Sequence, residues 1–132
     1  MTERLELYKC KICGNLVEVV LSGVGELVCC NEPMQRLDGK TNDNASNEKH
    51  VPVFIDKGNN TSEVRIGAKA HPMEKEHYIQ FIETISEDKN FVQRMYLYPT
   101  EEPVMKIDNN DKIKIAREFC NIHELWENPE IK

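Results

Sequence analysis

The stretch 8-YKCKICGNLVEVVLSGVGELVCCNEPMQRL-37 decides the fold of the first part of the chain. It carries four of the five cysteines, and the turn formers Gly14, Gly23 and Gly25 separate its short runs of β-branched and aliphatic residues. Short apolar runs bounded by glycine are typical of β-hairpins, and clustered thiols supply ligands for a tetrahedral metal ion. We therefore expect a small unit over residues 1–37 in which hairpins wrap round a metal.

The spacing of these cysteines indicates what kind of metal site they form. Cys10 and Cys13 make a C-x2-C pair, and Cys29 and Cys30 are adjacent. Four thiolates close a tetrahedral site for zinc or iron and leave no position for a substrate, so the site holds structure or passes electrons. A structural zinc site is the ordinary interpretation. However, zinc ribbons and rubredoxins present two C-x-x-C pairs, and neighbouring thiolates should distort the tetrahedron.

Composition limits the partners and the compartment of the protein. The formal net charge is −6 and the lysines and arginines are scattered, which argues against nucleic-acid binding. No apolar run approaches the roughly 18 residues of a membrane span, and the N-terminus lacks the pattern of a secretory signal. An odd number of cysteines favours metal ligation in a reducing compartment over a disulfide framework. We expect a cytoplasmic protein without a nucleic-acid or membrane partner.

The polar segment DGKTNDNASNEK (38–49) indicates a boundary near residue 38. Beyond it, short runs rich in β-branched and aromatic residues predict an antiparallel sandwich or barrel; these runs are 62–70, 77–85, 90–98, 103–107 and 112–119. Residues 115–128 could instead form a helix, in which Cys120 and His123 would share a face. We expect a strand leading into a loop there.

The stretch 71-HPMEKEHYIQF-81 places His71 and His77 six residues apart, and all four histidines, including His50 and His123, follow residue 38. Each lies at the edge of a predicted strand or in a loop, where a lone histidine is usually a surface or hydrogen-bonding residue. Together with Cys120 they form a candidate set of five ligands. Imidazole suits iron, zinc and copper, and zinc prefers four ligands. Four imidazoles and one thiolate with a sixth position open therefore favour iron and a reaction.

Four motifs, in order, carry a resemblance to a known family: YKCKICGNLVEVVLSGVGELVCCNEPM, EKHVP, HPMEKEHYI and FCNIHELW. With these motifs the chain resembles desulfoferrodoxin, the two-iron class of superoxide reductase, over nearly its whole length. The motifs use every cysteine and every histidine. The resemblance implies an all-β protein, with a small desulforedoxin-like iron module at 1–37 and an immunoglobulin-like catalytic β-sandwich of about seven strands at 38–132.

The resemblance also implies two irons per chain and their ligands. The first iron would be held by the four clustered thiolates of Cys10, Cys13, Cys29 and Cys30. The second would have four equatorial imidazoles and one axial thiolate, from His50, His71, His77, His123 and Cys120. Its open position would face Glu48 and Lys49; in the family this glutamate can occupy the sixth position of the oxidised iron, and the lysine assists catalysis.

The activity implied by the resemblance is the one-electron reduction of superoxide to hydrogen peroxide without release of dioxygen. Lys49 suits this role because an ammonium beside the open position attracts a small anion. The electrons would come from a rubredoxin-type donor, and the family is homodimeric. Two alternatives remain: a non-catalytic iron- or zinc-binding protein and a rubredoxin-like electron carrier. Colour and metal content distinguish these, since a zinc protein is colourless.

Two positions depart from the family pattern. Many relatives have glycine after the last histidine and tryptophan in the strand that follows HY, whereas this chain has Glu124 and Phe81. We expect the Glu124 side chain to point to solvent.

Overall fold

The computed structural model describes residues 1–42, 50–67, 71–107 and 112–131. The chain divides into two compact units, Met1–Asp38 and Gly39–Lys132. Every regular element of the described residues is a β-strand, which confirms the all-β prediction. The described part of the chain contains no helix long and apolar enough to cross a membrane.

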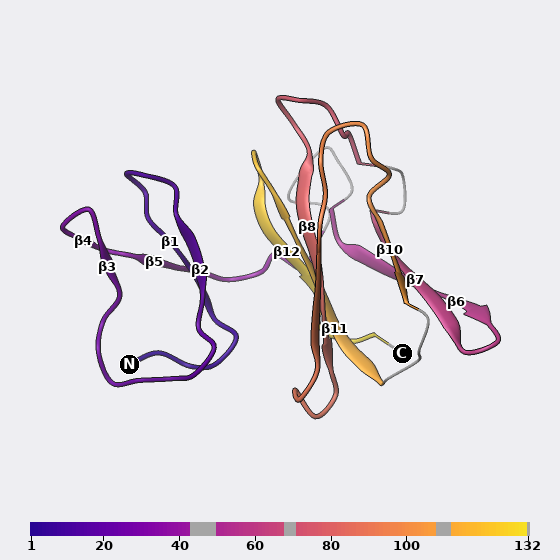
Figure 1. Cartoon of the computed structure of the whole chain (residues 1–132), viewed down its shortest axis with the longest axis horizontal. Coiled ribbons are helices and arrows are strands. Elements are labelled where there is room, and N and C mark those ends of the chain that lie inside the picture. Colours follow the sequence, from indigo (N-terminus) through magenta and orange to yellow (C-terminus); the bar gives the residue numbers. More distant parts are fainter. Residues whose placement is uncertain (43–49, 68–70, 108–111, 132) are drawn as a thin grey trace. The chain divides into compact units, whose positions relative to one another are not determined.

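Unit 1 consists of short hairpins (Figure 1). Three strands form an antiparallel sheet in the order β2-β1-β5; their bounds are Leu7–Lys9 (β1), Leu16–Glu18 (β2) and Gln35–Leu37 (β5). A second hairpin pairs β3 (Val28–Cys29) with β4 (Glu32–Pro33). The unit buries few apolar side chains, namely Leu7, Cys10 and Val19. Its apolar core is therefore small.

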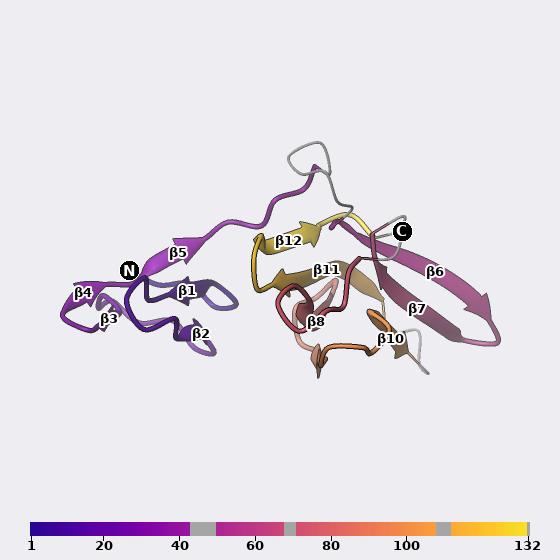
Figure 2. The same ribbon diagram turned by 90° about the horizontal axis from the view of Figure 1, so that it is seen from above.

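Unit 2 consists of two antiparallel sheets (Figure 2). One has the order β10-β7-β6, with β6 at Pro52–Gly58, β7 at Thr61–Ile66 and β10 at Val104–Ile107. The other has the order β12-β11-β8-β9, with β8 at Ile79–Ser86, β9 at Val92–Tyr96, β11 at Ile113–Cys120 and β12 at Glu124–Asn128. These seven strands confirm the predicted sandwich. The prediction had not singled out β6, whose outer half is exposed and lacks regular alternation.

One apolar cluster lies between the two sheets and explains why they pack together. Its buried residues come from both sheets: Val64, Ile66, Met105 and Ile107 from one, and Ile79, Ile82, Ala116 and Cys120 from the other. In β7 buried and half-buried residues alternate, as expected for a strand with one face toward the core. Cys120 thus lies at the edge of the core, at the last residue of β11.

The segment that could have been a helix is a strand, a turn and a second strand. β11 ends at Cys120, a turn follows at 121–123, and β12 begins at Glu124, which pairs directly with Cys120. The predicted strand is confirmed, but the expected loop is short and leads into β12. Leu125 and Trp126 are buried in this strand, so tertiary packing favours the extended conformation. Glu124 has φ +64°, a conformation that favours glycine.

Candidate metal centres

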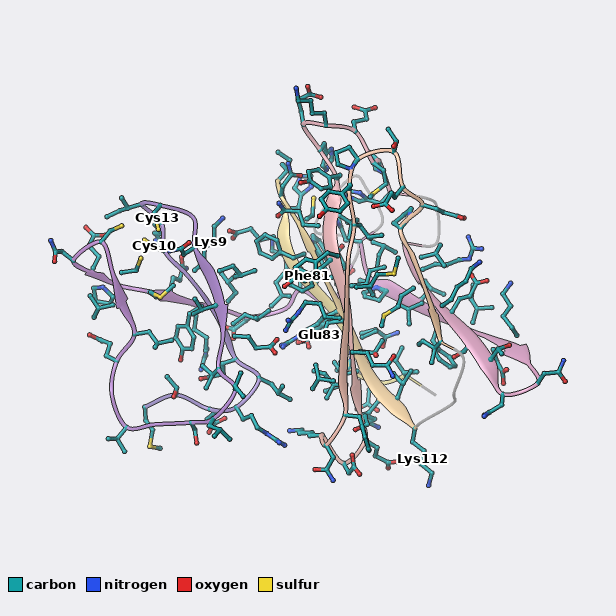
Figure 3. The ribbon with its side chains drawn as sticks, in the orientation of Figure 1. Lys9, Cys10, Cys13, Phe81, Glu83 and Lys112 are labelled. Atoms are coloured by element: carbon teal, nitrogen blue, oxygen red, sulfur yellow. The ribbon has the colours of Figure 1, made fainter. Side chains whose placement is uncertain are left out.

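The four clustered cysteines of unit 1 come together from two turns. Cys10 follows β1, Cys13 lies in the turn that leads to β2, and Cys29 and Cys30 lie in and just after β3. Their ligand atoms all lie within 4.8 Å of one another. The Cys13 and Cys29 sulfurs are 3.5 Å apart. Figure 3 shows Cys10 and Cys13 close together in this unit.

The adjacent pair Cys29 and Cys30 reaches one centre because the backbone turns between them. Consecutive side chains of a regular strand point to opposite faces, which would separate the two thiols. Cys30 and Asn31 instead have φ +53° and +62°, as in the two-residue turn of a tight hairpin. The Cys29 and Cys30 sulfurs are consequently 4.0 Å apart.

Within the thiol cluster, the pKa values of Cys10 and Cys30 are those expected of a site that binds a cation. The backbone N–H of Cys13, 3.5 Å from the Cys10 sulfur, lowers the pKa of Cys10 to about 6. Hydrogen bonds to Cys13 and Cys10 raise the pKa of Cys30 to about 12. The cluster therefore holds one thiolate readily but resists further ionisation unless a cation balances the charge. These donors fit a tetrahedral iron or zinc ion.

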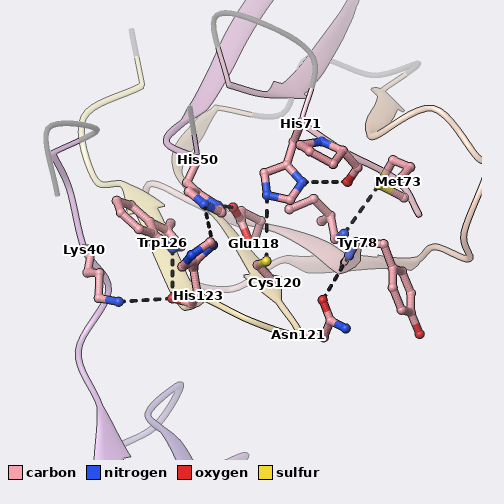
Figure 4. A network of polar contacts seen from close by, with 12 residues as sticks. Lys40, His50, His71, Met73, Tyr78, Glu118, Cys120, Asn121, His123 and Trp126 are labelled. Atoms are coloured by element: carbon pink, nitrogen blue, oxygen red, sulfur yellow. Dashed lines mark hydrogen bonds and ion pairs between the residues drawn. The ribbon is translucent and has the colours of Figure 1, made fainter. Parts of the chain in front are cut away.

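A second group forms in unit 2 from residues far apart in the sequence. His50 precedes β6, His71 lies in the loop before β8, Cys120 ends β11, and His123 lies in the turn to β12. Their ligand atoms also lie within 4.8 Å of one another. His50 Nε2 lies 3.1 Å from His123 Nδ1, and the Cys120 sulfur lies 3.7 Å from His71 Nε2 (Figure 4).

His77 lies beside this group without being among those four residues. Its ring centroid is 4.9 Å from that of His71 and 5.2 Å from that of His123. A tight turn brings it there, because the backbone N–H and C=O groups of Glu74 and His77 bond reciprocally at 2.9 and 3.0 Å. The six-residue spacing of His71 and His77 thus corresponds to a chain reversal that returns the second imidazole to the first.

Hydrogen bonds fix which nitrogen each buried imidazole presents. His71 Nδ1 donates to the Pro72 carbonyl at 2.7 Å, since a carbonyl can only accept, and this leaves the Nε2 lone pair on the side of Cys120. His50 Nδ1 lies 3.2 Å from Glu118 Oε2, and both side chains are fully buried. Such partners orient metal-binding imidazoles and set their tautomer. The group therefore presents nitrogen and sulfur donors suited to iron.

Sequence reasoning missed three residues around this group. Glu118 orients His50, Trp126 stacks on His50 with ring centroids 4.4 Å apart, and Lys40 donates to the His123 carbonyl at 3.1 Å. In the predicted strand Glu118 shares a face with Ala116 and Cys120, and a carboxylate on such an apolar face was a signal for a buried polar partner. Nothing in the sequence indicated Lys40. Glu48 and Lys49, which the resemblance implicated, lie outside the described residues.

Comparison with known proteins identifies the family. The family "Desulfoferrodoxin, N-terminal domain" matches residues 2–37, and the family "Desulfoferrodoxin" matches residues 42–129. Desulfoferrodoxin of Desulfarculus baarsii is 48% identical over 96% of this chain and 97% of that protein. A desulfoferrodoxin homologue of Archaeoglobus fulgidus is 47% identical over 96% of this chain and 98% of that protein.

Solved structures agree with this family and this fold. The superoxide reductase from Treponema pallidum has a TM-score of 0.74 and 25% identity, covering 96% of this chain and 99% of that one. A one-iron superoxide reductase from Giardia intestinalis has a TM-score of 0.50 and 31% identity, covering 64% of this chain and 99% of that one.

An all-β chain with one group of four thiols and a second group of imidazoles and a thiol defines an iron-binding oxidoreductase with two metal centres. The chain belongs to the desulfoferrodoxin family. The two groups match the two iron centres of that family, so the resemblance found in the sequence is confirmed.

Proposed function

We propose that this chain is a superoxide reductase. Superoxide, one electron and two protons would give hydrogen peroxide, and no dioxygen would be formed. The observation that carries the proposal is the convergence of three histidines and Cys120 within 4.8 Å. The similarity to the Treponema pallidum superoxide reductase over 96% of the chain supports it.

We assign two ligand sets in this proposal. The first iron would be held by the thiolates of Cys10, Cys13, Cys29 and Cys30, which leave no position for substrate. The second would be held by the imidazoles and thiolate of His50, His71, His77, His123 and Cys120. Iron at the second centre would supply the electron that superoxide accepts. His77 is included because its ring adjoins those of His71 and His123.

Glu48 and Lys49 complete the proposal from the sequence side. Both immediately precede the proposed ligand His50 in the sequence. An ammonium at Lys49 would attract superoxide and stabilise negative charge that develops beside the iron. Glu48 would compete for the open position when the iron is oxidised.

The surface of unit 1 supports a homodimer. Unit 1 exposes a set of aliphatic side chains that is large for so small a core: Val20 (72%), Leu21 (83%), Val24 (89%) and Val28 (58%). Small units with little core gain stability from burial against a partner. We propose that a second copy of the chain covers this surface.

A rubredoxin-type protein would supply electrons, and exposed Cys13 and Cys30 leave the first centre accessible to it.

The two domains of the chain would be residues 1–37 and 38–132. Five cysteine thiols that form no disulfide require reducing conditions, which favour the cytoplasm.

Superoxide consumption by the reduced, iron-loaded protein tests the activity, with peroxide and dioxygen yields measured together. We expect one peroxide per superoxide and no dioxygen. His77→Ala should abolish the reaction, and Lys49→Ala should slow it. Lys112→Ala is the matched control, because this exposed lysine precedes β11 at the end opposite Cys120 (Figure 3).

Two results would reject the proposal. One is the absence of superoxide consumption in a wild-type protein that contains two irons per chain. The other is a dioxygen yield of one per two superoxides consumed, which would indicate dismutation. Unchanged consumption in His77→Ala would remove His77 from the site.

A further inference from the structure

Lys40 is held beside the second centre by its backbone. Its N–H donates to the Leu125 carbonyl at 3.1 Å, and its carbonyl accepts from the Glu127 N–H at 2.9 Å. The residue forms a parallel bridge with Trp126 in β12. Gly39 allows this close approach, because a Cβ there would lie 2.6 Å from Glu127 Cγ. Two backbone bonds therefore fix the point from which the Lys40 side chain starts.

The Lys40 ammonium converges with the indole of Trp126 on one carbonyl. Nζ donates to the His123 carbonyl at 3.1 Å, and Trp126 Nε1 donates to the same oxygen at 3.0 Å (Figure 4). The ammonium also lies 5.1 Å from the centroid of the indole ring, within the range of a cation–π interaction. The side chain thus makes two directed contacts although the residue is exposed.

Both contacts lead to histidines of the second centre. The carbonyl of His123 accepts both hydrogen bonds, so the peptide group of His123 cannot rotate without breaking them. Trp126 is 1% exposed and stacks on the His50 imidazole, with an interplanar angle of 10°. The nitrogens of these two imidazoles face each other at 3.1 Å. The Lys40 side chain therefore contacts the groups that hold two of the proposed metal-binding imidazoles in place, those of His50 and His123.

We propose that Lys40 is a positioning residue of the second iron centre, which fixes His123 and the Trp126–His50 stack and raises the reduction potential of the iron. A nearby positive charge favours the reduced, less positive state of a metal. The inference rests on the proposed function only for the iron at this centre, and nothing in it requires superoxide.

The first test uses the metal-free protein. Trp126 is the only tryptophan of the chain, so its fluorescence reports on this place alone. We expect Lys40→Met to raise the acrylamide quenching constant about twofold, because the indole loses its cation and the carbonyl one of its two donors. Lys40→Arg retains a cation that stacks on aromatic rings and should stay close to wild type. Lys112→Met should equal wild type.

The second test is a potentiometric titration of the iron-loaded protein with redox dyes. Lys40→Met should lower the potential of the second centre by the equivalent of a twofold to threefold change in equilibrium constant, about 20 to 30 mV at 59 mV per tenfold. Lys40→Arg should restore it. Lys112→Met, which removes the same charge at the opposite end of β11, should leave it unchanged.

The proposal is overturned if the second centre has the same reduction potential in Lys40→Met as in Lys112→Met. It is also overturned if Lys40→Met lowers this potential and Lys40→Arg does not restore it. Because neither test uses superoxide, failure of the proposed activity and failure of this inference are distinguishable. A protein that titrates as expected but consumes no superoxide would retain the role of Lys40 and lose the reductase assignment.

Discussion

The two metal centres differ in what holds their ligands in place. In unit 1 the thiols lie on turns, and Cys13 and Cys30 are exposed. In unit 2 His50, His71 and Cys120 are buried, and Cys120 belongs to the core between the sheets. The first centre therefore depends on its metal for order, whereas the fold of unit 2 gathers its ligands by itself.

The physical basis of this difference is the amount of apolar surface each unit buries. Leu7, Cys10 and Val19 are the buried apolar residues of unit 1, too few to offset the conformational entropy of about 38 ordered residues. Unit 2 buries a cluster that extends through both sheets. Metal binding then contributes folding free energy in unit 1 and mainly reactivity in unit 2.

Removal of the metal from the first centre should have the largest effect on stability. A small effect would contradict the difference drawn here between the two centres. We expect Cys13→Ser, or chelation, to cost unit 1 on the order of 10 kcal/mol of metal-binding free energy and to unfold it. Hydrogen exchange should show unprotected amides in β1 and β2 and protected amides in β8 and β11. His71→Ala is the control, because it should leave both units protected. Retained protection of β1 without metal would show that unit 1 has a sufficient core.

Loss of the Glu118 carboxylate should test the support of the second centre. Glu118→Ala leaves the buried His50 Nδ1 without this partner, which should cost about 2 kcal/mol of unfolding free energy and lower metal affinity roughly 10- to 100-fold. Glu118→Gln retains an acceptor of the same size and should cost less. Denaturant unfolding and competition with a chelator measure the two quantities. Equal effects of both variants would exclude the hydrogen bond as their cause.

Metal uptake should depend on pH more steeply at the first centre. The pKa of Cys10 is about 6, so it has lost its proton at pH 7 to 8, whereas the pKa of Cys29 and that of Cys30 are raised and both retain theirs. Zinc must displace at least these two protons, so affinity should rise at least about 100-fold per pH unit in this window and fall as pH decreases.

Calorimetry in buffers of different ionisation enthalpy counts the protons released. His71→Ala isolates the first centre and Cys13→Ser the second, where one thiol ligand instead of four should release fewer protons. Equal proton release at the two centres would contradict the contrast drawn between thiol and imidazole ligands.

The smallest effect concerns the backbone beside His123. Glu124 has φ +64°, which costs a residue with a Cβ roughly 1 to 2 kcal/mol, partly offset by the greater entropy that glycine loses on folding. Glu124→Gly should therefore stabilise unit 2 by about 0.5 to 1 kcal/mol in denaturant unfolding. Glu124→Ala removes the same charge but keeps the Cβ, so it should not stabilise. An equal gain in both variants would point to charge instead of backbone strain.

Particular residues show how far sequence reasoning reached. The runs around β7, β8, β9, β10 and β11 were predicted because their β-branched and aromatic residues fit a pleated, half-buried surface. β6 was not singled out, since only its first residue, Pro52, is buried. The strand after His123 was predicted as a loop because short-range signals do not reveal that Leu125 and Trp126 are covered by other strands.

The sequence by itself determined the all-β class, the family and the identity of the candidate ligands, because these depend on residue type and spacing. The tertiary structure decided which atoms meet: the turn at Cys30 that brings adjacent thiols together, the buried partner of His50 in Glu118, and the contact of Lys40 with His123. Lys40 and His123 are separated by 83 positions. Such contacts arise from strand pairing across the fold, and no local pattern encodes them.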